Sequence, residues 1–130
     1  MSFNSDKHVA YIGREFCIEW YVDAKGASQA LDFAETMPPN YIAKLMHLFE
    51  VMGDVGTIYN KTKFRNEGGK IYAFKPQPYR FLSFFTCENK IIITNGFYKK
   101  QMKLPNIEKQ RALKAMNDYL QRVREGKYYD

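Results

Sequence analysis

Four cations carry the most specific chemistry that this sequence offers: Lys75, Arg80, Lys99 and Lys100. No Asp or Glu lies close to any of them in the sequence, so drawing them together costs electrostatic energy unless an anion binds among them. An arginine suits a phosphate group, because its planar guanidinium donates two parallel hydrogen bonds. The sequence therefore indicates a phosphate-binding site. Ordinary loop lysines around a structural arginine are the alternative.

The positive charge of the chain is concentrated in its middle third. Residues 61–103 contain ten Lys and Arg and two Asp and Glu, a net charge of +8, whereas residues 1–60 carry −4 and residues 104–130 carry +2. A basic surface on one part of a small domain is typical of a protein that binds a polyanion. A solvated basic face without a partner is the other interpretation.

Metal and cofactor chemistry is not indicated by this sequence. Cys17 and Cys87 do not have the spacing of metal ligands, and His8 and His47 stand apart from other ligand types,. Gly68-Gly69 lacks the lysine and hydroxyl residue of a phosphate-binding loop and indicates a turn before a strand. We therefore expect no metal and no cofactor. Short apolar runs and the absence of a secretory pattern predict a cytoplasmic protein with no membrane partner.

The first half of the chain predicts one strand and two helices. Residues 17–22 are rich in β-branched and aromatic types, as in a strand. Ser28 is a good N-cap for a helix that ends before Pro38-Pro39. A second helix follows those prolines, with one apolar face and a stop at Gly53. Its apolar face is formed by Ile42, Leu45, Met46, Phe49 and Met52.

The second half predicts a three-stranded meander and a final helix. Residues 70–75, 79–86 and 90–97 alternate with a period of two, and residues 86–89 form the turn of a hairpin,. Pro105 suits the first turn of the last helix and Gly126 its end. The apolar spacing along this helix places Leu113, Met116, Leu120 and Val123 on one face,.

These elements predict an α+β fold, in which an antiparallel sheet of the first strand and the meander packs with an N-terminal helical hairpin and a C-terminal helix. Residues 17–126 would form a single domain, with residues 1–16 as an arm and 127–130 as a tail. The short connection Pro76-Gln77-Pro78 brings Lys75 close to Arg80. Because the end of the last strand lies beside the start of the strand before it, Lys99 and Lys100 reach the same rim, with Lys103 a little beyond.

The stretch from residue 70 to residue 105 is similar to the RelE/HigB toxins of the RelE/ParE superfamily, in particular to the phage-related HigB-like branch. The similarity rests on an aromatic-Arg pair that enters a strand, on a Gly-Phe segment followed by two lysines, and on a lysine shortly before a proline. Here these are Tyr79-Arg80, residues 95–100 and residues 103–105. The order of elements over residues 17–123 also agrees, so the resemblance implies a RelE-like fold.

The resemblance implies the toxin of a type II toxin–antitoxin system, which cleaves mRNA without a metal, commonly on the ribosome. Its partners would be mRNA and an acidic antitoxin. Arg80 matches the arginine that contacts the scissile phosphate, and Lys75, Lys99 and Lys100 match the family's basic positions. Any of these lysines could accept a proton if its neighbours lower its pKa. The remaining RNA-binding candidates are Tyr79, Tyr98, Lys103 and Lys70, the tyrosines through stacking on a base.

Three departures from the family pattern leave other functions open. Asn95 replaces the usual histidine before Gly-Phe, Ile71 and Ala73 stand where some members carry lysines, and no tyrosine follows at the start of the last helix. A ParE-like module that inhibits gyrase is therefore one alternative, because a fold by itself fixes no chemistry. A catalytically degenerate phage-related protein is the other.

Overall fold

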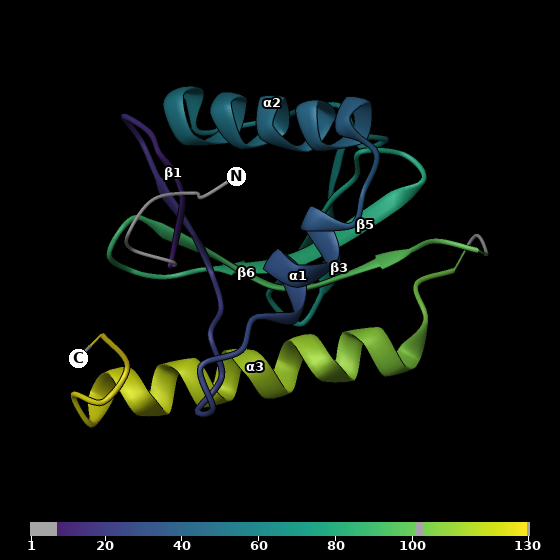
Figure 1. The fold of residues 1–130 in the computed structure, drawn as a ribbon. Coiled ribbons are helices and arrows are strands. Elements are labelled where there is room, and N and C mark those ends of the chain that lie inside the picture. The colour runs from purple at the N-terminus through teal and green to yellow at the C-terminus, as the bar shows by residue number, and fades with distance from the viewer. Residues whose placement is uncertain (1–7, 101–102, 130) are drawn as a thin grey trace.

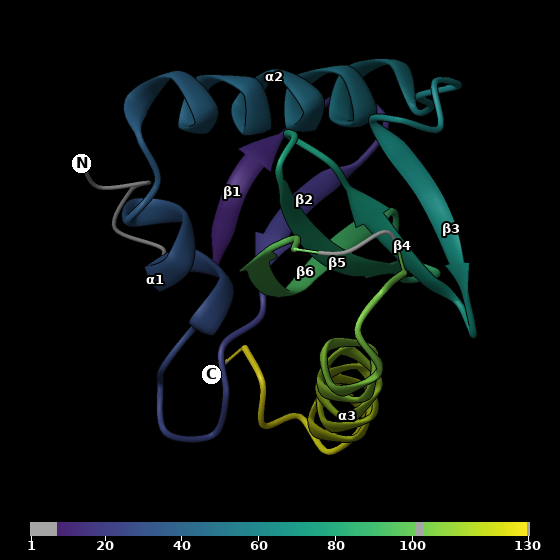
Figure 2. The same ribbon diagram turned by 90° about the vertical axis from the view of Figure 1, so that its right-hand side faces the viewer.

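A six-stranded sheet forms the middle layer of the protein, with helices on both faces (Figures 1 and 2). The computed structural model describes residues 8–100 and 103–129. Its strand order is β1-β2-β6-β5-β4-β3. The elements are β1 (Val9–Ile12), β2 (Cys17–Trp20), α1 (Gln29–Glu35), α2 (Pro39–Val55), β3 (Phe64–Gly68), β4 (Ile71–Phe74), β5 (Tyr79–Phe85), β6 (Lys90–Tyr98) and α3 (Asn106–Arg124).

The α+β class is confirmed, and the prediction of a purely antiparallel sheet is wrong. Strands β3 to β6 form an antiparallel meander, but β2 pairs with β6 in parallel, from Cys17 opposite Lys90 to Trp20 opposite Ile93. The sheet is therefore mixed. A parallel pair requires a long crossover between its strands, and α1, α2 and strands β3 to β5 supply it,.

Two edge strands were not predicted. Strand β1 lies within residues 1–16, which the sequence left as an arm, and pairs with β2; residues 1–7 of that arm lie outside the described part of the chain. Strand β3 has the sequence Phe-Arg-Asn-Glu-Gly, in which only Phe64 is buried. Its polar side chains hide the alternation that marks a strand, because an edge strand can be solvated on most of its surface.

The helices begin where the sequence predicts. The hydroxyl of Ser28 accepts a hydrogen bond from the backbone N–H of Leu31 at 3.3 Å, which caps α1. Pro39 begins α2, where its missing N–H costs nothing,. The two helices do not form a hairpin packed on itself: α1 lies against β6, whereas α2 packs on β1 and β2.

Gly53 does not end α2, as the sequence suggested. The helix continues to Val55 and ends at Gly56, which adopts a left-handed conformation with φ of 90°,. Gly53 instead allows a close approach, since a Cβ at this position would lie 2.8 Å from the ring of Tyr11. Its carbonyl accepts hydrogen bonds from the backbone N–H groups of Glu15 and Phe16 at 2.7 and 3.0 Å, which ties the turn between β1 and β2 to the helix.

Helix α3 covers the sheet face opposite to α2 (Figure 2). It follows Pro105 and ends before Gly126, as predicted. Its buried positions are Ala112, Ala115 and Tyr119, whereas Leu120 is 37% exposed. Leu113, Met116 and Val123 of the predicted face pack against this core but are only partly buried, so the centre of the buried face is shifted towards the small alanines. No helix of the described residues has the length and apolar character needed to cross a membrane.

The predicted tail packs on the domain at the end of α3. The Tyr128 ring is buried, and its hydroxyl accepts a hydrogen bond from the backbone N–H of Val22 at 2.9 Å. The Tyr129 hydroxyl donates to buried Glu19 at 2.7 Å. Lys90 lies 3.3 Å from the same carboxylate. Residues 128 and 129 therefore contribute to the packing between the sheet and the last helix.

Candidate functional site

A cavity of about 470 Å³ lies between the ends of β3 to β6 and the first turn of α3. In Figure 1 this is the end of the molecule where the chain leaves β6 and turns back into α3. Its lining residues come from every strand of the meander and from the helix. They are Arg65, Glu67, Lys75, Arg80, Phe97, Lys99, Lys103, Leu104, Pro105, Asn106 and Lys109.

Strand alternation explains why the cations converge on this cavity. Ile71 and Ala73 of β4 are buried on the face that α3 covers. Two residues further on the same side comes Lys75. Arg80 of β5 lies opposite Phe97 of β6, which packs on the α3 side too. The predicted convergence of Lys75, Arg80 and Lys99 is thus what the structure shows.

Arg80 is a buried cation that forms no ion pair with the described residues, although Glu67 in the same cavity acts on its charge and raises its pKa. Its side chain is 5% exposed and donates one hydrogen bond, from Nη1 to the carbonyl of Tyr79 at 2.9 Å. No carboxylate of the described residues lies within ion-pair distance of it. Burial lowers its pKa, which reports the cost of holding the charge in the protein,. A guanidinium has five N–H donors, so most of its hydrogen-bonding capacity is open to an anion in the cavity.

Lys75 and Lys99 share the same electrostatic environment. Lys75 is 8% exposed and its Nζ donates to the carbonyl of Lys61 at 3.1 Å. Burial is the main cause that lowers the pKa of Lys75; Glu67 opposes it, and Arg80, Arg65 and Lys99 lower the pKa further. Burial and then Arg80 also lower the pKa of Lys99. Both shifts make the neutral amines, which can accept a proton, easier to form.

Three charged residues of the cavity were missed by the sequence analysis. Arg65 and Glu67 lie on the unpredicted strand β3, and Lys109 lies in α3. Glu67 is the only carboxylate among the residues that line the cavity. Lys109 donates from Nζ to the main-chain carbonyl of Glu67 at 2.9 Å, which ties α3 to β3. The Gly68-Gly69 turn was the sequence signal for β3. It precedes β4, and a turn between two antiparallel strands also implies a strand before it.

Two further hollows continue from the cavity. One is lined by Lys61, Thr62, Gln77 and Lys100 and shares Arg65, Lys75, Arg80 and Lys99 with the cavity. The other lies against α2 and shares Thr62, Lys75 and Gln77 with the hollow that Lys61 and Lys100 line. Together the three hollows have a single carboxylate in their walls, that of Glu67, and ten cations. These are Lys44, Lys61, Lys63, Arg65, Lys75, Arg80, Lys99, Lys100, Lys103 and Lys109.

The predicted RNA-binding residues are only partly brought together. Lys103 lines the cavity. Tyr98 is 51% exposed, whereas the ring of Tyr79 packs edge-on against Tyr98 and Tyr41 at centroid distances of 5.4 and 5.1 Å. Tyr98 is therefore the more exposed of the two rings. Lys70 lies apart, at the far end of β4, beside a hollow lined by Tyr72 and Phe85.

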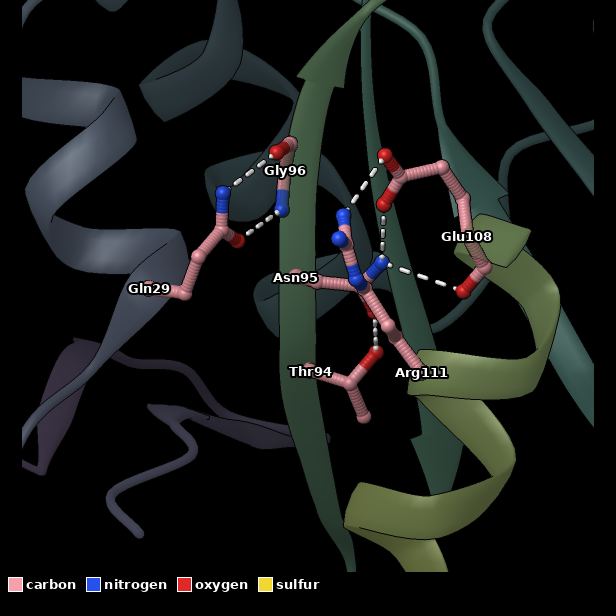
Figure 3. Close-up of polar contacts among 6 residues, drawn as sticks. All are labelled: Gln29, Thr94, Asn95, Gly96, Glu108 and Arg111. Carbon is pink, nitrogen blue, oxygen red and sulfur yellow. Dashed lines mark hydrogen bonds and ion pairs between the residues drawn. The ribbon is translucent and has the colours of Figure 1, made fainter. Parts of the chain in front are cut away.

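Asn95, at the position where the HigB-like pattern of the sequence analysis has histidine, is a buried residue that bonds to its neighbours (Figure 3). Its Nδ2 donates to the main-chain carbonyl and to Oε1 of Glu108, in the first turn of α3, at 3.2 and 3.0 Å. Thr94 donates to its Oδ1 at 2.6 Å, and Arg111 donates to the other carboxylate oxygen of Glu108 at 3.1 Å. Asn95 thus fixes the helix end that lines the cavity.

Strand β6 is held on its other side by Gln29 of α1 (Figure 3). The side-chain amide accepts from the backbone N–H of Gly96 and donates to its carbonyl, both at 2.8 Å. These two bonds continue the ladder after Ile93, where pairing with β2 ends. A side chain at position 96 would not fit, since a Cβ there would lie 2.5 Å from the ring of Phe81.

Among the described residues, no cluster of three or more His, Cys, Asp or Glu could hold a metal ion. The fold and the cavity define a small α+β protein with a cavity lined mainly by cations. The model of the family described as Phage derived protein Gp49-like (DUF891) matches residues 32–117. The chain belongs to this family. No curated protein matches the sequence.

Proposed function

We propose that this protein is a RelE/HigB-like toxin that cleaves mRNA at the Arg80 cavity. The observation that carries the proposal is a buried arginine that forms no ion pair with the described residues, next to two lysines of lowered pKa. Unpaired buried charge is costly, so such an arrangement is maintained where an anion binds it. Membership of a phage-derived family and the resemblance of residues 95–105 to RelE/HigB toxins support the same function.

The proposed reaction is transesterification of the RNA backbone. The ribose 2′-oxygen attacks the adjacent phosphorus, its proton passes to a base, and the bond to the 5′-oxygen breaks as that oxygen takes up a proton. The products are a 2′,3′-cyclic phosphate and a 5′-hydroxyl. Arg80 holds the phosphate through two N–H groups and stabilises the charge that develops on it. Lys99 and the positive end of the α3 dipole add to that stabilisation.

Two groups of the cavity are suited to accept the proton. Lys75 is the better candidate, because burial and neighbouring cations lower its pKa and the residue lines the cavity. Glu67 is the other, as the only carboxylate in that wall. The ribosome would supply the substrate's orientation, which explains how a site with few acid–base groups can act.

A neutralising partner with an acidic segment is part of the proposal. The net charge of +8 over residues 61–103 would speed its association in a salt-sensitive manner,. The experiment is expression of the chain alone and together with the product of the neighbouring gene. Growth arrest with transcript fragments that carry 5′-hydroxyls, relieved by the neighbour, is the expected result. Normal growth with intact transcripts would contradict the proposal.

A further inference from the structure

We propose that the hollow between α2 and the 75–77 connection is a nucleobase subsite, which holds the base of a nucleotide whose phosphate lies in the Arg80 cavity. This inference rests on the proposed function and adds to it a place where the RNA base is bound. The hollow has a volume of about 470 Å³, within the range of about 300–1,000 Å³ that is usual for small-molecule sites,.

The phosphate site and this hollow are neighbours that share wall residues with a connecting hollow. Lys75 lines the cavity, the hollow against α2 and the one that connects them. Thr62 and Gln77 are shared by the connecting hollow and the hollow against α2. A ligand with an anionic group at Arg80 can therefore extend around Lys75 towards α2 without leaving a cation-lined surface.

The wall chemistry of the hollow fits a base. Ala43 and Leu48 of α2 and Pro76 offer apolar surface against which a flat ring can lie. Gln77 adds a polar group, while Lys44 and Lys63 add positive charge. A nucleotide has the complementary parts: a ring with apolar faces, polar edges and an anionic phosphate. The charge complementarity with the connected cavity is the reason to assign a nucleotide and not an apolar peptide side chain.

Hydrogen bonds hold the walls of the hollow in place. The backbone N–H of Lys75 donates to the carbonyl of Lys63 at 2.8 Å, and Gln77 Nε2 donates to the carbonyl of Thr62 at 2.9 Å. Because a carbonyl can only accept, this bond fixes the orientation of the Gln77 amide. Its Oε1 accepts no hydrogen bond from the described residues, so it is available as an acceptor for the edge of a base.

The test measures binding of 2′-O-methyl trinucleotides, which cannot be cleaved by attack of a 2′-hydroxyl. Fluorescence anisotropy compares an intact trinucleotide with analogues that lack the base at one position. We expect the wild-type protein to lose about tenfold in affinity for one of the abasic analogues. Amide NMR signals of residues 43–48 and 75–77 should shift with the intact ligand and much less with that analogue.

Ala43→Trp fills the hollow from an exposed position of α2, and Val55→Trp places the same ring at the exposed far end of the helix. We expect Ala43→Trp to bind intact and abasic ligands equally, and Val55→Trp to discriminate like the wild type. Gln77→Leu, which removes the acceptor, should weaken discrimination between bases. Thermal midpoints near that of the wild type establish that the variants are folded.

If the wild type binds every abasic analogue as tightly as it binds the intact trinucleotide, the subsite does not exist. Discrimination that survives in Ala43→Trp would also overturn it, and would leave the hollow to a protein partner. The proposed nuclease fails separately, if the wild type discriminates between these ligands but leaves mRNA intact on ribosomes.

Discussion

The side chain of Asn95 on β6 donates two hydrogen bonds to Glu108 in the first turn of α3, at 3.2 Å to the main-chain oxygen and at 3.0 Å to Oε1. Because α3 also supplies Asn106 and Lys109 to the cavity, this contact connects the sheet to one wall of the site. The residue that departs from the family's histidine therefore acts here as a positioning residue for the helix.

Asn95→Ala should destabilise the protein by about 1–3 kcal/mol, because the substitution removes a buried amide and its hydrogen bonds to Thr94 and Glu108,. Urea denaturation measures the difference. Asn117→Ala is the matched control, an exposed asparagine on α3, and should change stability by less than about 0.5 kcal/mol,. Equal stabilities of the two variants would contradict the role of Asn95.

Arg80 and Leu82 are two positions apart on β5. Alanine substitutions of the two residues should distinguish a role in RNA cleavage from a role in the stability of the fold. Arg80→Ala removes a buried charge that forms no ion pair with the described residues, so RNA binding and cleavage should be lost while the free energy of unfolding changes by less than about 1 kcal/mol,. Leu82 is fully buried, and Leu82→Ala should cost about 2–5 kcal/mol,. Chemical denaturation and cleavage assays are run on both. If Arg80→Ala unfolds the protein, Arg80 is structural.

Inorganic phosphate should stabilise the folded protein at the Arg80 cavity. A ligand that binds only the native state raises the thermal midpoint, so phosphate should raise it by a few degrees relative to chloride at the same ionic strength. Arg80→Gln should abolish this difference. Arg124→Gln removes the same charge from an exposed position at the other end of α3 and should preserve it. An equal phosphate effect in both variants would indicate diffuse binding.

The pH dependence of cleavage should identify the proton acceptor. If the neutral amine of Lys75 is the base, the rate rises with pH through its lowered pKa. Glu67 raises that pKa, so Glu67→Gln should move the rising limb to lower pH. Lys75→Arg keeps the charge but cannot deprotonate, and should remove most cleavage.

The pH–rate profiles of these two variants can also reject Lys75. Loss of cleavage in Glu67→Gln at every pH would make Glu67 the base. Cleavage by Lys75→Arg at the wild-type rate would restrict Lys75 to binding. Glu88→Gln, at an exposed turn, is the control for loss of one carboxylate.

The sequence predicted the meander because its alternation is strong and its turns are marked. Pro76 and Pro78 fix one end of the strands, and residues 86–89 fix the other, so the meeting of Lys75, Arg80 and Lys99 follows from local pattern alone. The same pattern failed for β3, whose polar residues obscure the alternation. Arg65 and Glu67 were lost from the predicted site for that reason.

Non-local packing accounts for the other differences. The parallel pairing of β2 with β6 depends on residues about 73 apart in the chain, and no local signal encodes its direction,. In α3 the leucine spacing predicted that the face with Leu120 is buried, but the smaller Ala112 and Ala115 are the residues buried against the sheet. Gly53 lies in close contact with Tyr11, but its position near the end of the helix led to its interpretation as a helix stop.

The most direct test of the account is cleavage of mRNA on purified ribosomes by the wild-type protein and by Arg80→Ala, with the chemistry of the RNA ends determined. The account predicts cuts with 2′,3′-cyclic phosphate and 5′-hydroxyl ends from the wild type, unchanged in EDTA, and none from Arg80→Ala. Intact mRNA with the wild type, or cuts that require a divalent metal, would contradict it. Inhibition of gyrase supercoiling would then favour the ParE-like alternative, and no effect in either assay the degenerate phage-related protein.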